Sequence, residues 1–183
     1  APTIGFATVW TYLLTPTVGF ISQVAKMMGV TAPDFLNDPQ YAIYTIMVVY
    51  LWREAGFVMI FYTSGLQNIS PEYYEAALID GASAPQRFFK ITLPMLSPVI
   101  FFNLLMGIIT AFKTFTESMV ITNGGPFDKT LVYALYIYRQ SFQYYKMGYA
   151  CALSWVLLCI IGVVSIFVFR SSESWVHYES KGD

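Results

Sequence analysis

Three long apolar segments constrain this sequence more than any other feature. They run from about residue 41 to 64, from 96 to 121 and from 147 to 169. Each is long enough to cross about 30 Å of hydrocarbon as a helix, which takes about 20 residues. Only 11% of the residues are charged, where a soluble domain carries about a quarter. We therefore expect an all-α transmembrane protein.

A fourth apolar stretch, residues 1–14, is too short to span a membrane alone. We expect it to be the end of a spanning helix that begins before this sequence. The chain starts at Ala1, with neither an initiator methionine nor the pattern of a secretory signal, so we interpret it as an internal fragment.

The lysines and arginines of the loops leave the orientation in the membrane open. Three full spans place an insert at residues 70–94 and the tail after Arg170 on one side, and loops 15–40 and 122–146 on the other. Both sides then carry the same number of basic residues, so the positive-inside rule does not decide the orientation. One side has Arg87, Lys90, Arg170 and Lys181, and the other has Lys26, Lys129, Arg139 and Lys146.

Several function classes lack their sequence signals. The net charge is −1 with no basic block, which argues against a nucleic-acid partner. No phosphate-binding GxxxxGK[ST] loop is present, so the chain lacks the usual signature of an ATP-binding protein. We find no catalytic arrangement, and the single histidine, His177, is expected to be solvated in the polar tail. Cys151 and Cys159 share one apolar run, too far apart on a helix for a disulfide, and are interpreted as core or lipid-facing thiols.

The polar insert interrupts the apolar segments with signals for two short helices. A serine cap followed by proline predicts the first helix start, a glycine predicts its end, and a capping box predicts the second start. We expect a proline to close the unit. These signals are Ser70, Pro71, Glu72, Gly81, Ser83 with Gln86, and Pro94.

The same insert carries a family resemblance. Glu75-Ala76-Ala77, then Asp80-Gly81-Ala82, then Phe88, Ile91, Leu93 and Pro94 resemble the EAA motif of membrane subunits of binding-protein-dependent ABC importers. The segments "DPQYA" from Asp38, "TNGGP" from Thr122 and "WVHYE" from Trp175 are similar to the carbohydrate importers of this family, in particular the maltose-type first permease.

This resemblance implies a type I permease helical bundle of about six spans, of which this chain holds the C-terminal half or more. The insert would be the cytoplasmic coupling loop, contacting the ATPase through Glu75, Ala76, Ala77, Asp80 and Gly81. The implied partners are a second permease subunit, an ATP-binding subunit dimer, an external solute-binding protein and a carbohydrate, in the bilayer of the bacterial inner membrane. No cofactor is implied. The alternative is an amphipathic loop lying on the bilayer surface.

Ionisable residues inside the apolar segments form a second candidate site, because charges in hydrocarbon are costly. Lys113 and Glu117 are one helical turn apart and could pair on one face. Alignment with maltose-type permeases implies a substrate path that includes Arg53, Glu54, Phe57, Thr110, Ala111 and Thr114. The alternative is that these charges only neutralise one another. Because Arg53 and Glu54 point about 100° apart on a helix, we expect one to line the path and the other to pair with Lys113 or Glu117.

The sequence thus predicts a permease subunit of an ATP-driven sugar importer, which is not itself an enzyme. A cargo of glycerol-phosphate or another non-sugar solute is the first alternative. An ion-driven secondary transporter with Glu54 and Glu117 as proton sites is the second, and an intramembrane enzyme the third. The residue types at the path positions differ from the maltose pattern, which points to a different sugar. The aromatic segment after "TNGGP" is expected either to help receive the binding protein or to anchor at the membrane interface.

Overall fold

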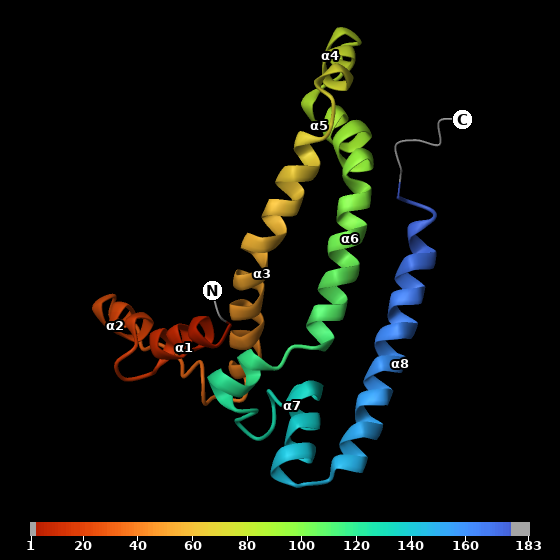
Figure 1. Ribbon diagram of the computed structural model, residues 1–183. Coiled ribbons are helices and arrows are strands. Elements are labelled where there is room, and N and C mark those ends of the chain that lie inside the picture. Colours follow the sequence, from red (N-terminus) through yellow and green to blue (C-terminus); the bar gives the residue numbers. More distant parts are fainter. Residues whose placement is uncertain (1–2, 177–183) are drawn as a thin grey trace. The chain divides into compact units, whose positions relative to one another are not determined.

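The computed structural model describes residues 3–176 (Figure 1). His177 and Lys181 therefore lie outside the described residues. Within that range the chain is helical and contains no strand, as predicted. Three helices in this range are long and apolar enough to cross a membrane, and they are α3 (Ala42–Gln67), the continuous helix Ala84–Phe112 that includes α6 (Leu93–Phe112), and α8 (Met147–Ser172).

The chain divides into two compact units, each with parts of the long helices. Of the described residues, the first contains 3–54 and 111–158, and the second contains 55–110 and 159–176. In the first unit, α1 (Thr3–Leu14) packs against α2 (Phe20–Met27) and against the π-helical turn η2 (Ser118–Thr122). The core of this unit is small and apolar, formed by Ala7, Leu14, Val49 and Ile121.

Both loops predicted on the first unit contain helices. We expect a loop over residues 15–40 from the sequence, but the structure contains α2 there. This helix has only eight residues, which makes it hard to predict between turns. Residues 122–146 include α7 (Tyr133–Tyr138) and the π-helical turn η3 (Arg139–Gln143). Helix α2 packs against α1, and the Tyr133 hydroxyl of α7 donates to the Leu153 carbonyl of α8.

The second unit packs the end of α3 against the start of α6. A Cβ atom on Gly65 would lie 2.8 Å from side-chain carbons of Leu96 and Val99, so only glycine lets the helices approach this closely. The rings of Phe61 and Phe102 meet further along, with centroids 5.7 Å apart. The end of α8 belongs to the same unit, where the Phe169 ring packs edge-on against the Phe101 ring of α6, with centroids 5.7 Å apart.

The insert between α3 and α6 begins with the predicted helix. In α4 (Pro71–Ile79) the Ser70 side chain accepts a hydrogen bond from the Glu72 N–H. The helix ends in a Schellman motif, in which the N–H groups of Gly81 and Ala82 bond back to the carbonyls of Leu78 and Ala77. Gly81 has φ +74°, and a Cβ there would meet nothing within 4 Å. The requirement for glycine is therefore conformational rather than steric.

The prediction that Pro94 closes the insert is wrong. The helix that starts at α5 (Ala84–Arg87) continues through the π-helical turn η1 (Phe88–Thr92) into α6. The Leu93 N–H bonds to the Phe88 carbonyl, and this wider turn makes room for the proline ring that follows. Pro98 then leaves the Pro94 carbonyl without an N–H donor, and the Ser97 hydroxyl donates to it instead (2.6 Å).

The second predicted span, residues 96–121, is also wrong as one continuous helix. Helix α6 ends at Phe112, residues 113–115 leave the helix, and a separate helical turn leads into η2. No glycine or proline lies at the break, so the sequence carries no local signal for it. Contacts with α3 accompany the break, as described below.

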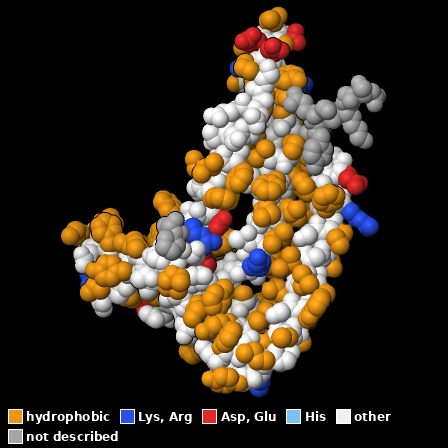
Figure 2. All heavy atoms as spheres, viewed as in Figure 1, with side chains coloured by type: hydrophobic (Ala, Val, Ile, Leu, Met, Phe, Trp, Pro, Cys, Tyr) orange, Lys and Arg blue, Asp and Glu red, His pale blue; other side chains and the backbone are white. Residues whose placement is uncertain are grey.

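Most apolar side chains of the long helices face outward. None of the residues in the most apolar 18-residue window of α8 is buried within this chain. Hydrophobic side chains cover much of the face shown in Figure 2. Cys151 and Cys159 are free and exposed on α8, in line with the lipid-facing interpretation. The exposed apolar surface indicates contact with lipid or with further subunits.

Candidate functional site

A charge cluster of three side chains lies in the first unit. Arg53 on α3 donates from Nε and Nη2 to Glu54 Oε1, at 3.0 and 2.6 Å. Its Nη1 donates to Glu117 Oε1, just before η2. The guanidinium also lies over the Tyr50 ring, 5.3 Å from the centroid. One arginine therefore holds two carboxylates and joins α3 to the segment after the helix break.

Burial differs strongly among the members of this charge cluster. The Glu117 side chain is 2% exposed, whereas those of Arg53 and Glu54 are 24% and 29% exposed. A buried carboxylate needs a cation and hydrogen bonds to offset its lost hydration, and Arg53 supplies both. Glu54 remains open enough to contact another molecule.

The predicted pairing of Lys113 with Glu117 is wrong. Because α6 ends at Phe112, these two residues do not lie on one helix face, and Glu117 pairs with Arg53 instead. Lys113 is exposed at the end of α6 and forms no ion pair with the described residues. One of Arg53 and Glu54 was expected to pair with Lys113 or Glu117, and Arg53 does pair with Glu117. Arg53 also pairs with Glu54, so the two neighbouring side chains interact with each other as well.

The remaining predicted path residues divide between the two units. Thr114 lies in the first unit, where its side chain is a hydrogen-bond partner of Tyr50. Ala111 is exposed at the end of α6. Phe57 and Thr110 belong to the second unit, where Phe57 is 61% exposed and the Thr110 hydroxyl donates to the Met106 carbonyl. Sequence reasoning missed Tyr50, although its position one turn before Arg53 was a usable signal.

The insert exposes the residues predicted to contact an ATPase. Glu75, Ala76, Asp80 and Gly81 are exposed, and Ala77 is half-buried. The Tyr74 hydroxyl lies 2.9 Å from that of Thr92, which holds α4 against the start of the long helix. Acidic side chains gather with hydrophobic ones over the α4 tip (Figure 2). The structure thus presents a rigid, acidic and partly apolar tip.

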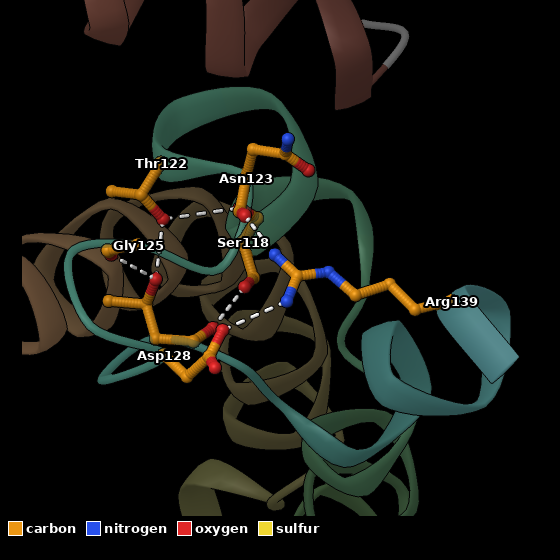
Figure 3. A network of polar contacts seen from close by, with 7 residues as sticks. Ser118, Thr122, Asn123, Gly125, Asp128 and Arg139 are labelled. Carbon is orange, nitrogen blue, oxygen red and sulfur yellow. Dashed lines mark hydrogen bonds and ion pairs between the residues drawn. The ribbon is translucent and has the colours of Figure 1, made fainter. Parts of the chain in front are cut away.

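A hydrogen-bond network fixes the segment that follows η2 (Figure 3). The buried Thr130 hydroxyl donates to the Gly125 carbonyl (2.6 Å) and lies 2.6 Å from the Thr122 hydroxyl. The Ser118 hydroxyl donates to the Thr130 carbonyl. These bonds join both ends of the loop to the helical turn η2.

Arg139 of η3 ties the same loop from a second direction (Figure 3). Its Nη1 donates to Asp128 (2.9 Å) and its Nη2 donates to the Asn123 carbonyl (2.6 Å). A Cβ on Gly124 would lie 2.7 Å from this guanidinium. A side chain at this position would displace the guanidinium, and the φ of +79° itself favours glycine there.

A second ordered turn precedes α3 in the first unit. The Asp34 carboxylate accepts hydrogen bonds from the backbone N–H groups of Leu36 and Asn37, and from the Asn37 side chain. Partial burial alone would raise the pKa of Asp34, but the bonds from Asn37 and Leu36 outweigh it and lower the pKa below its usual value. The turn is thus held by an ionised carboxylate.

Comparison with known proteins assigns the family. Residues 1–173 match the family described as "Binding-protein-dependent transport system inner membrane component". This chain belongs to that family, whose members are transport subunits rather than enzymes.

Individual relatives agree with this assignment. The chain is 49% identical over 147 residues to the probable ABC transporter permease protein YesP of Bacillus subtilis, covering 79% of this chain and 47% of YesP. It is 36% identical over 155 residues to the arabinooligosaccharides transport system permease protein AraP of the same organism, covering 84% and 50%. The chain thus spans about half the length of these relatives.

A solved structure shares the fold. The bacterial alginate ABC transporter, in complex with its alginate pentasaccharide-bound periplasmic protein, contains a chain that matches with a TM-score of 0.83 and 26% identity. The match covers 92% of this chain and 59% of the other. The fold is therefore that of an ABC importer permease, a multi-pass membrane protein.

Proposed function

We propose that this chain is a permease subunit of an ATP-driven carbohydrate importer, in which it lines part of the translocation path and works by alternating access. Family membership is the observation that carries this proposal. The similarity to an arabinooligosaccharide permease and to an alginate transporter supports a saccharide cargo. The proposed setting is the bacterial inner membrane.

The insert is proposed to couple this subunit to an ATPase on the cytoplasmic side. Its tip carries Glu72, Glu75 and Asp80 beside exposed Ile79, a combination that suits a cleft with basic and apolar walls. The helix from Ala84 runs without interruption into α6. A force on the insert would therefore reach the membrane-spanning part of α6 through one rigid element.

The charge cluster is proposed to border the substrate path. Irregular backbone at membrane depth is tolerated where it is buried in protein or lines a watery cavity, and the break at residues 113–115 is such a segment. Glu54 is the more accessible of the two carboxylates, and a carboxylate accepts hydrogen bonds from sugar hydroxyls. Phe57 is proposed to offer an apolar surface to a pyranose ring.

The sequence left two alternative functions, and they are not equally supported. Import of glycerol-phosphate or another non-sugar solute by the same kind of ATP-driven transporter remains an alternative. An ion-driven mechanism with Glu54 and Glu117 as proton sites is disfavoured, because this family depends on binding proteins. The pairing of both carboxylates with Arg53 further disfavours free proton exchange there.

Reconstitution tests the proposal directly. The complete transporter, with its second permease and ATPase, is placed in liposomes together with its candidate external binding proteins and a panel of labelled saccharides. We expect uptake that requires both ATP and one binding protein. Uptake that continues without ATP, driven by a proton gradient, would support the secondary transporter instead.

A further inference from the structure

The loop Asn123–Thr130, here called the Phe127 loop, exposes a large apolar side chain in a strained conformation. Phe127 is 89% exposed and has φ +50°. Asp128 beside it has φ +56°, so two consecutive non-glycine residues adopt the left-handed region. Such conformations are costly and persist where the surrounding structure imposes them. Neither burial nor local turn chemistry accounts for phenylalanine at this position.

Hydrogen bonds fix the backbone of the Phe127 loop, so the loop cannot easily move to bury Phe127. Thr130 is 1% exposed and anchors the loop through Gly125 and Thr122, while Arg139 holds Asp128 (Figure 3). A side chain displayed on a fixed loop loses little entropy on binding. Aromatic residues presented in this way are frequent among the residues that dominate binding energy at protein interfaces.

A cavity of about 360 Å³ lies next to the base of the Phe127 loop. Its walls come from Leu36 and Asn37 of the Asp34 turn and from residues 120–123, 125 and 126. Both walls are fixed by the hydrogen bonds described above, and both belong to the first unit. The surface therefore combines an apolar projection with a preformed hollow that has apolar and polar lining.

The side of the membrane on which the Phe127 loop lies limits which molecules can bind this surface. One span, α3, separates the Asp34 turn from the insert, and one span, α6, separates the insert from the Phe127 loop. The turn and the loop thus lie on the same side, opposite the insert. If the insert contacts the ATPase, as proposed, this surface faces the exterior.

We propose that Phe127 is the apolar anchor by which the external binding protein docks, with a side chain of that protein entering the adjacent cavity. This inference rests on the proposed function. A bilayer is a poorer occupant, because Phe127 is followed by the exposed charges Asp128 and Lys129, which lose hydration in hydrocarbon. The related alginate transporter was solved with its periplasmic protein bound, which supports an external protein partner.

Substitutions at Phe127 separate docking from folding. Phe127→Ala in the complete transporter should weaken binding of the purified binding protein by about tenfold or more, the loss typical of an interface anchor. Phe127→Gly should weaken it equally and yet leave the melting temperature unchanged or higher, because glycine relieves the strain at φ +50°. A merely structural phenylalanine would not give that combination.

Tyr145 provides the matched control. It is 82% exposed with φ +55°, but it lies after η3 and lines no part of the cavity. Tyr145→Ala should change the affinity for the binding protein by less than about twofold.

The affinity is measured by titrating labelled binding protein onto transporter in lipid nanodiscs, and ATP-driven uptake is measured in parallel. Unchanged affinity of both Phe127 variants, with normal uptake, would overturn the docking inference and leave the proposed function intact. A change only in lipid association would assign Phe127 to the membrane and also overturn it. Failure of the unmodified transporter to bind any candidate protein or to use ATP would overturn both proposals.

Discussion

Removing the cation from the charge cluster should lower the free energy of unfolding more than removing either carboxylate. Arg53→Met leaves Glu117, 2% exposed, without its cation, and leaves a second carboxylate beside it. Breaking a buried pair from one side costs about 3–5 kcal/mol. Glu117→Gln keeps the shape and exchanges a charge-assisted hydrogen bond for a neutral one, a loss of about 1–2 kcal/mol.

The double variant tests whether the two residues act as a pair. Arg53→Met with Glu117→Gln removes the stranded buried carboxylate, so part of the loss from Arg53→Met should return. We expect a coupling free energy of at least about 1 kcal/mol, because residues in direct contact are rarely additive. Glu54→Gln with Arg53→Met is the matched comparison, and it should recover less because Glu54 is 29% exposed and partly hydrated.

Thermal unfolding of the purified complex in detergent gives the order of stabilities, and the yield of assembled complex gives an independent measure. The expected order is unmodified, then Glu117→Gln, then the double variant, then Arg53→Met. Additive losses in the cycle, or an Arg53→Met complex as stable as the unmodified one, would show that the ion pair does not hold α3 to the segment after the break.

Three further predictions address coupling, topology and the path. Gly81→Val should reduce co-purification of the ATPase or uncouple its hydrolysis from uptake, whereas Gly81→Asn, which tolerates φ +74° better, should retain both; equal behaviour of the two variants would contradict a conformational role. In a background without Cys151 and Cys159, Ser83→Cys should resist an impermeant thiol reagent in intact cells while Asp128→Cys is labelled, and the reverse pattern would invert the orientation. Glu54→Gln should lower uptake or shift the preferred saccharide while assembly stays normal; a loss of assembled complex instead would make Glu54 a structural counter-ion.

The helices were predictable from sequence where local chemistry decides them. The helix start at Pro71, the helix end before Gly81 and the apolar length of α3 follow from caps, backbone freedom and hydropathy, which all act within a few residues. Two errors concern Pro94 and the break after Phe112. At Pro94, a widened π-helical turn just before the proline keeps the helix continuous. The break after Phe112 is accompanied by an ion pair between Glu117 and Arg53 of α3, a long-range contact that local sequence signals do not reveal.

The pairing within the charge cluster shows why a candidate site is harder to predict than a fold. Spacing of four residues made Lys113 and Glu117 look like partners, but that spacing brings side chains together only if the helix is continuous. Once the helix ends at Phe112, Glu117 is free to turn toward Arg53, 64 residues earlier in the chain. The break allows Glu117 to reach Arg53, and the ion pair in turn stabilises the broken conformation. Loss of helical hydrogen bonds at residues 113–115 is offset where Glu117 gains a charged partner, and Lys113 is left at the end of α6, where a cation favours the negative end of the helix dipole.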